Sequence, residues 1–339
     1  MAEVEITTEL QEIQSNLWGV NVRENIALAL EKLQNLPEEP NPIQGSLNLS
    51  LLDTASWKLG LLKNSIQGKE DTLQSRKDQL DRIKAKLEQV SGRTILQYGQ
   101  CGDDVYYAIC DDGEAALYGT GATYDYTFHD SVFYQNGQIK KIVLSNGITG
   151  LGDRLFYHCA NAETVSLPAT LTSIGDSAFA QEDAAIGYTA GLTSVTIPQA
   201  VTAIQSYAFY HTAIAEVTVP ASVKTWGKYA FSGCAKLKTA RVACDSIGSF
   251  AFTRCTALSN LTISANCKTF GQNILTYCEN LKIITYEGTI AQWNAITKPT
   301  NWMSSGKHYY NDYLQKVQCT DGYLEYDSEN DVWNEVKNG

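Results

Sequence analysis

Cysteines and paired carboxylates are the side chains in this sequence with the most obvious capacity for chemistry. The chain has nine cysteines but only four histidines, no C-x-x-C pair, and no histidine at ligand spacing from a cysteine. This spacing argues against a zinc site. The pairs Asp103–Asp104 and Asp111–Asp112 flank a tyrosine-rich segment, which is typical of solvated turns. A glycosidase would need its carboxylates to converge across a cleft, and sequence alone does not show convergence.

Sequence motifs of catalytic loops are missing as well. No G-x-S-x-G, H-E-x-x-H, Walker or Rossmann pattern occurs, and Gly119 and Gly121 lack the lysine and the strand-to-helix context of a phosphate loop. We therefore expect a protein that is not an enzyme, with no catalytic residue, no cofactor and no metal. Cys101 and Cys110 flank a predicted hairpin, where either a disulfide or two free thiols would fit.

An internal repeat must position whatever site the chain carries. A short strand pattern, apolar-x-x-apolar-x-apolar, begins at Ile139, Ala162, Leu192, Ile214, Leu237, Leu258 and Leu281, with spacings of 23, 30, 22, 23, 21 and 23 residues. A second pattern, most often Gly-x-x-Ala-Phe, ends in Phe156, Phe179, Phe209, Phe231, Phe252 and Leu275. One such unit buries its apolar face only by stacking on its neighbours. The periodicity therefore predicts a pile of coils with a parallel sheet.

Four of the cysteines occupy one position of this repeat. They are Cys159, Cys234, Cys255 and Cys278, each three residues after the aromatic or leucine that ends the second pattern. A position that recurs from coil to coil serves packing far more often than chemistry. We expect these thiols to be buried and structural.

Together these motifs resemble the BspA-like leucine-rich repeat family, whose pattern is close to L-x-x-V-x-I-P-x-x-V-x-x-I-G-x-x-A-F-x-x-C. The resemblance covers about residues 138–296, and Leu117–Tyr126 and Tyr286–Ile296 are similar to the opening strand and the closing cap. Gln205 in place of glycine and the shortened turn at Ala243–Ser246 depart from the pattern. The resemblance implies surface-exposed binding and adhesion proteins, not enzymes.

The residues before the repeats predict helices. Residues 20–36 have one apolar face, and between Leu59 and Val90 apolar residues recur at seven-residue intervals. We expect a coiled-coil stalk through which the chain associates with itself as a homotrimer; the alternative is an amphipathic helix packed on its own chain. The predicted fold class is therefore α+β, helices and stalk followed by a solenoid. The predicted domains are an N-terminal helical attachment region at 1–55, a stalk at 56–93, a β-rich cap at 94–137, the solenoid at 138–296, and a C-terminal cap with an acidic tail at 297–339.

The short segment Asn21–Lys32 resembles a helical segment near the start of some bacteriophage tail and baseplate proteins. With the stalk and the repeats, it suggests a tail fibre or receptor-binding protein in the virion. Such a protein would contact other tail or baseplate proteins through its N-terminus and a cell-surface protein or glycan through its repeats. The alternative hypothesis is a bacterial leucine-rich repeat surface or host-interaction protein, at the cell surface or in the cytoplasm.

Charge and hydropathy exclude two kinds of partner. There are 26 basic and 37 acidic residues, a net charge of −11, which would repel a phosphate backbone. We therefore expect no nucleic acid partner. No run of about 20 apolar residues occurs and Met1–Leu17 does not resemble a signal peptide, so we expect no membrane insertion.

Two groups of residues are candidates for binding. The first surrounds Gln181–Gly191, where about seven residues are inserted, because inserted solenoid loops often carry recognition. This group is Tyr188, Tyr207, Tyr210 and His211. The second consists of strand residues expected to face outward, Thr196, Glu216, Thr218 and Arg241. The alternatives are a tolerated surface insertion and an ordinary solvated strand face.

Overall fold

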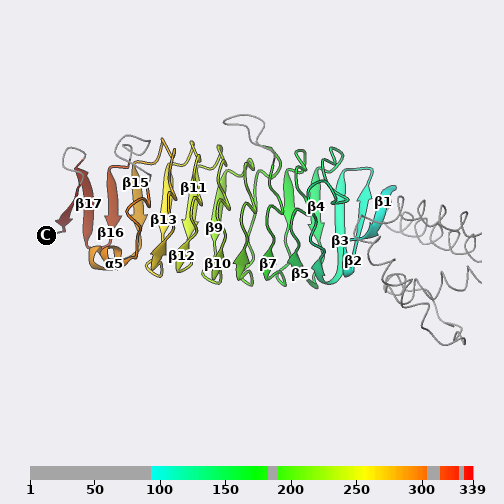
Figure 1. Ribbon diagram of the computed structural model, residues 1–339, viewed down its shortest axis with the longest axis horizontal. Coiled ribbons are helices and arrows are strands. Elements are labelled where there is room, and N and C mark those ends of the chain that lie inside the picture. The colour runs from blue at the N-terminus through cyan, green and yellow to red at the C-terminus, as the bar shows by residue number, and fades with distance from the viewer. Residues whose placement is uncertain (1–92, 182–189, 304–313, 328–331, 339) are drawn as a thin grey trace, which may run out of the picture.

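The computed structural model describes residues 93–181, 190–303, 314–327 and 332–338. These residues form an elongated solenoid of narrow coils, closed at each end by antiparallel strands (Figure 1). The first end consists of β1 (Ile95–Gln100), β2 (Gly102–Cys110) and β3 (Glu114–Thr123). Strand β3 pairs antiparallel with β2 and parallel with the first strands of both solenoid sheets, so it joins the cap to the coils.

Successive coils contribute short strands to two faces, although the coil that begins at Leu192 has only an isolated bridge, from Ser194 to Thr164, on the first face. The first face contains β4 (Lys141–Leu144), β6 (Thr164–Ser166), β9 (Glu216–Val219), β11 (Thr239–Val242), β13 (Asn260–Ile263), β15 (Ile283–Tyr286) and β16 (Lys316–Cys319). The second contains β5 (Ile148–Leu151), β7 (Ser173–Ile174), β8 (Ala203–Ile204), β10 (Thr225–Trp226), β12 (Ser246–Ile247) and β14 (Thr269–Phe270). Neighbouring coils pair in parallel and in register, as with Val217, Ala240 and Leu261. The predicted parallel sheet is confirmed.

Prolines begin the turn that joins the two faces in three coils. The carbonyls of Pro168, Pro198 and Pro220 accept hydrogen bonds from the amides of Leu171, Val201 and Val223, at 3.1 to 3.2 Å. Proline suits this place because it fixes its own φ and the preceding strand residue is already extended. The apolar residue three positions later is fully buried in each case.

The far end is closed by a short helix and a hairpin. Helix α5 (Ile290–Ala295) begins with a capping box between Thr289 and Gln292. Its Trp293 is buried against Phe270, Tyr286 and Trp302 at centroid distances of 5.3 to 6.0 Å. Strand β17 (Gly322–Asp327) extends the first face antiparallel to β16, and β18 (Val332–Lys337) pairs antiparallel with β17.

The predicted fold class is wrong. The part of the chain that the structure describes is nearly all β, and α5, six residues long, is its one helix. A coil of about 22 residues is used up by two short strands and their turns, which leaves no room for a helix in the repeat. The helices and coiled coil on which the α+β assignment rested, in residues 1–55 and 56–93, lie outside the described residues except for Arg93. No helix within the described ranges is long and apolar enough to cross a membrane.

Candidate functional site

Besides the two strand faces, a row of turn residues runs along the solenoid where the chain passes from the second face back to the first. One residue of each coil, directly before the buried Ala-Phe or its equivalent, has a left-handed backbone with φ between 53° and 60°. This row, which we call the turn column, consists of Arg154, Ser177, Tyr207, Tyr229, Phe250 and Asn273. Non-glycine residues rarely adopt this conformation, so the surrounding structure must enforce it.

Hydrogen bonds between coils enforce the turn-column conformation. The amide of Tyr207 donates to the carbonyl of Lys228 in the next coil at 2.9 Å, and the amide of Tyr229 donates to the carbonyl of Ser249 at 3.0 Å. The same bond recurs at Arg154, Ser177, Phe250 and Asn273, at 2.8 to 2.9 Å. Turn-column residues of successive coils are therefore held side by side, whatever their side chains.

On the inner side of this column the Phe residues form a continuous stack. Centroids of successive rings from Phe133 to Phe252 lie 4.7 to 6.0 Å apart. The recurring cysteines pack beside them, and each thiol donates to the carbonyl of the Phe one coil earlier, as Cys159 does to Phe133 at 3.0 Å. The cysteines are thus structural, as predicted.

Burial makes these thiols poor nucleophiles. It raises the pKa of Cys159 and of Cys234 to about 12 and that of Cys255 well above its ordinary value. All nine cysteines are buried and free, so Cys101 and Cys110 are two thiols rather than a disulfide.

On the outer side, three successive turn-column residues are aromatic. The rings of Tyr207 and Tyr229 stack with centroids 4.9 Å apart, and those of Tyr229 and Phe250 stack at 4.4 Å. We call Tyr207, Tyr229 and Phe250 the aromatic column. Tyr210 meets the Tyr207 ring edge-on at 5.4 Å, and the His211 ring lies 4.2 Å from Tyr210. Tyr207 is 37% exposed.

The predicted site residues divide between two parts of the coil. Tyr207, Tyr210 and His211 come together at the aromatic column, although His211 is buried. Thr196, Glu216 and Thr218 are exposed in the strands or strand positions of the first face, as predicted, and Arg241 is half-buried there. Tyr188 lies outside the described residues.

Tyr229 and Phe250 were missed by sequence reasoning. The signal was present, because both stand directly before the Ala-Phe of their coils, as Tyr207 does. What was lacking was the knowledge that this position adopts the same left-handed conformation in every coil and so stacks its side chains.

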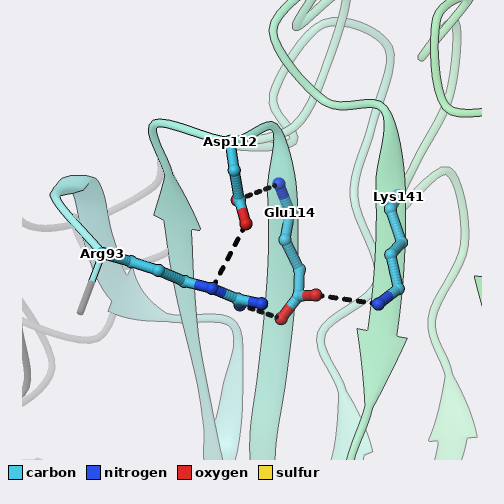
Figure 2. A network of polar contacts seen from close by, with 4 residues as sticks. All are labelled: Arg93, Asp112, Glu114 and Lys141. Atoms are coloured by element: carbon cyan, nitrogen blue, oxygen red, sulfur yellow. Dashed lines mark hydrogen bonds and ion pairs between the residues drawn. The ribbon is translucent and has the colours of Figure 1, made fainter. Parts of the chain in front are cut away.

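An ion-pair network at the beginning of the solenoid includes Asp112, one residue of the Asp111–Asp112 pair. Glu114 of β3 lies 2.6 Å from the guanidinium of Arg93 and 3.0 Å from the ammonium of Lys141, and Asp112 lies 3.2 Å from Arg93 (Figure 2). Burial disfavours the charge on Glu114, but the hydrogen bonds from Arg93 and Lys141 outweigh it and hold its pKa below the ordinary value. This network ties β3 to β4.

Other charged groups of the described chain are likewise engaged or exposed. Nη2 of Arg241 donates to both carboxylate oxygens of Glu287, two coils away on the first face, at 2.8 and 2.9 Å. Asp103 and Asp104 are exposed in β2. Within the described ranges, no group of three or more histidine, cysteine or acidic residues is arranged to hold a metal ion.

Comparison with known proteins identifies the repeat. The BspA type leucine rich repeat region matches in six copies over residues 126–186 and 182–297. That span is half of the chain, and it includes every residue of the turn column. A search among curated proteins found no match.

Several solved structures show distant likeness to this solenoid. One is a leucine-rich repeat protein from Bacteroides ovatus, with 17% identity over 64% of this chain and 70% of that chain and a TM-score of 0.38. A leucine-rich repeat protein from T. pallidum has 22% identity over 55% and 87%, with a TM-score of 0.39. A leucine rich cell surface protein from Faecalibacterium prausnitzii has 16% identity over 60% and 97%, with a TM-score of 0.29. At these scores the likeness carries no argument about function.

Proposed function

Because the chain belongs to the BspA type leucine-rich repeat family, we propose that it is a bacterial surface or host-interaction protein that binds a partner without catalysing a reaction. A fold does not by itself determine function, so the proposal depends on a particular surface of this molecule. That surface is the aromatic column with the adjoining Tyr210 and His211.

The observation that carries the proposal is that the fold does not require rings at the exposed turn-column position. The same backbone conformation and the same inter-coil hydrogen bond hold Arg154, Ser177 and Asn273 in other coils. Three successive rings, one of them 37% exposed, are thus more than the coil needs for folding. Exposed tyrosines with a polar tip and an apolar ring are typical anchors of protein and glycan contacts.

The absence of an enzymatic role is also part of the proposal. Raised pKa values make the recurring thiols weak nucleophiles, and Asp112 and Glu114 are engaged with Arg93. Neither group offers the pairing of nucleophile and base that covalent catalysis requires. The proposal likewise includes no cofactor.

The bacteriophage tail-fibre hypothesis finds no support among the proteins that resemble this chain. The segment that suggested it, Asn21–Lys32, lies outside the described residues, as does the predicted self-association segment 59–90. Virion location, contacts with tail or baseplate proteins and a trimeric stalk therefore stay untested predictions. We favour the alternative, a bacterial leucine-rich repeat protein at the cell surface.

Binding by the full-length protein to cultured host cells and to arrayed glycans tests the proposal. We expect attachment that the combined change Tyr207→Ala, Tyr229→Ala and Phe250→Ala reduces at least tenfold, since each lost ring anchor is worth roughly 1 kcal/mol or more. The matched control changes Thr196, Thr218 and Thr262 of the first face to Ala and should bind like the wild type. Attachment lost only in the control would move the site to the strand face. A wild-type protein that attaches to neither target would contradict the proposal.

A further inference from the structure

The aromatic column ends abruptly at Tyr207. Tyr229 has a ring stacked on each of its faces, whereas the described ring contacts of Tyr207 are Tyr229 on one face and Tyr210 at an edge. The next turn-column residue toward the N-terminus is Ser177, and the one after it is Arg154. The face of Tyr207 that points toward Ser177 is therefore the end of the stack.

The backbone continues unchanged where the ring is missing. Ser177 has a φ of 54°, Tyr207 has 57°, and both amides make the inter-coil bond, at 2.9 Å. Neighbouring coils are about 4.8 Å apart, so Arg154 and Tyr207 stand roughly 10 Å apart with one ring position between them. Ser177 is only 8% exposed although Tyr207 is 37% exposed. The longer side chains of Arg154 and Tyr207, in the two neighbouring coils, therefore extend further from the backbone than Ser177 does.

Polar groups with both donor and acceptor character surround this ring position. The Ser177 hydroxyl donates to Oδ1 of Asp176 at 2.6 Å, and Nη2 of Arg154 lies 3.5 Å from the same oxygen. The guanidinium of Arg154 also lies 4.6 Å above the centre of the ring of Phe128, a residue that is 60% exposed. The apolar face of the Tyr207 ring therefore lies next to the polar groups of Ser177 and Asp176 in the adjacent coil.

The charge beside the position selects against anions. Oδ1 of Asp125 accepts from the amide of Asp153 at 2.8 Å, and Oδ1 of Asp153 accepts from the amide of Asp176 at 2.7 Å, so three carboxylates lie on successive coils. Burial, and then the neighbouring Asp125 and Asp176, raise the pKa of Asp153 although its bond to the Asp176 amide lowers it. A phosphate or an acidic sugar would be repelled here.

We infer that Tyr207, Ser177 and Asp176, bordered by Arg154, form a binding site for one neutral hexose of a cell-surface glycan. The apolar face of the pyranose would stack on Tyr207 in the place of the missing ring, while its hydroxyls would bind Asp176, Ser177 and Arg154. An aromatic side chain of a protein partner fits less well, because it would cover these polar groups without pairing them. This inference rests on the proposed function and names the ligand of the same surface.

A ring placed at position 177 tests the inference directly. In Ser177→Tyr the new ring should extend the stack and occupy the hexose position, because Tyr207 and Tyr229 already adopt the same backbone conformation. The matched control is Asn273→Tyr, which extends the column beyond Phe250 at its other end from a φ of 53°. We expect Ser177→Tyr to weaken binding to arrayed neutral glycans at least fivefold and Asn273→Tyr to leave it within twofold.

Substitution of Tyr207 provides the second arm. Tyr207→Ala should weaken glycan binding at least fivefold, because it removes the ring on which the hexose would stack. Thermal unfolding of each variant shows whether it is folded. A folded Ser177→Tyr protein that binds neutral glycans as well as the wild type would overturn the inference.

The outcome for the wild type separates this inference from the proposed function. Wild-type protein that attaches to host cells but to no neutral glycan, or that prefers acidic glycans, overturns the hexose site and leaves the proposed function standing. Wild-type protein that attaches to neither cells nor glycans overturns both.

Discussion

The thiol of Cys255 donates a hydrogen bond of 3.2 Å to the carbonyl oxygen of Phe231, the aromatic residue of the preceding coil. The Phe231 ring in turn stacks on Phe252, three residues before Cys255, with centroids 6.0 Å apart. One coil is therefore joined to the next by a ring contact and a thiol contact at a fixed spacing. The repetition of Phe-x-x-Cys in the sequence reflects this geometry.

Removal of the Cys255 thiol should lower the free energy of unfolding moderately. Cys255→Ala loses the bond to Phe231 and leaves a small void, and we expect a loss of about 1 to 2 kcal/mol. Cys255→Val keeps the volume and loses only the donor, so it should cost about half as much; the Phe231 carbonyl also accepts from the Cys234 amide at 3.4 Å. Urea unfolding measures both. Equal costs for the two variants would show that the lost hydrogen bond alone matters here, and no cost for Cys255→Val would show that packing alone does.

Phe231 and Phe250 test which side of the coil is the core. Phe231 is fully buried between Phe209 and Phe252, so Phe231→Ala should cost about 3 to 5 kcal/mol. Phe250, one coil later, is an outward ring of the aromatic column, so Phe250→Ala should cost about 1 kcal/mol or less. Thermal or urea unfolding gives both values. A loss below 1 kcal/mol for Phe231→Ala would mean that the inner and outer positions are wrongly assigned.

Cys234 should make stability depend on pH in the alkaline range. Burial raises the pKa of its thiol from 9.0 to about 12, so above pH 9 the unfolded chain releases this proton before the folded chain does. The free energy of unfolding must then fall with rising pH, by up to about 1.4 kcal/mol per pH unit from this thiol between pH 9 and 12.

The control variant is Cys234→Thr, because Thr212 occupies the same position one coil earlier and does not titrate. The difference in unfolding free energy between wild type and variant, measured at pH 8 and pH 10, isolates Cys234 from other ionising groups. We expect the wild type to lose about 1 kcal/mol relative to the variant over this range. An unchanged difference would show that the folded thiol ionises as readily as the unfolded one.

Gly227 should tolerate no side chain. A Cβ there would lie 2.2 Å from the backbone nitrogen of Ser206 and 2.4 Å from the carbonyl carbon of Gln205, so the coils would have to separate. Gly227→Ala should therefore destabilise the solenoid by at least about 2 kcal/mol. Gly137→Ala is the matched control, since its Cβ would meet only the side-chain Nδ2 of Asn161, at 3.6 Å, and should change stability by less than about 0.5 kcal/mol. Equal melting temperatures for the two variants would contradict close coil packing at Gly227.

The core of each coil could be predicted from the sequence because its signal is periodic. Ile214, Val217 and Val219 are buried while Glu216 and Thr218 are exposed, as the alternation of apolar and polar residues implies. The stacking of Phe209, Phe231 and Phe252 follows in the same way, since residues at one place in each repeat must lie above one another. The buried thiols were predictable on the same ground.

The overall fold class could not be predicted, because the helices in the α+β assignment were inferred from residues 1–93, which contain no copy of the repeat. The apolar spacing from Leu59 to Val90 suits a helix, but it lies outside the described residues and says nothing about the coils. The coils themselves contain strands and turns, and α5 is the one helix of the described chain. The α+β assignment rested on helices predicted before the repeats, and it was wrong for the described residues, which are nearly all β.

Periodicity alone determined the coil, its buried rings and its outward strand residues. Only the tertiary structure decided the candidate site. Tyr207 stacks with Tyr229 and Phe250, and the stack ends at Ser177, because all these residues adopt a left-handed backbone. The residue types at these positions do not predict that conformation. That conformation is imposed by hydrogen bonds from one coil to the next, as from Tyr207 to Lys228. Such bonds exist only when the coils are stacked, so the alignment of these side chains is a property of the folded solenoid rather than of any single repeat.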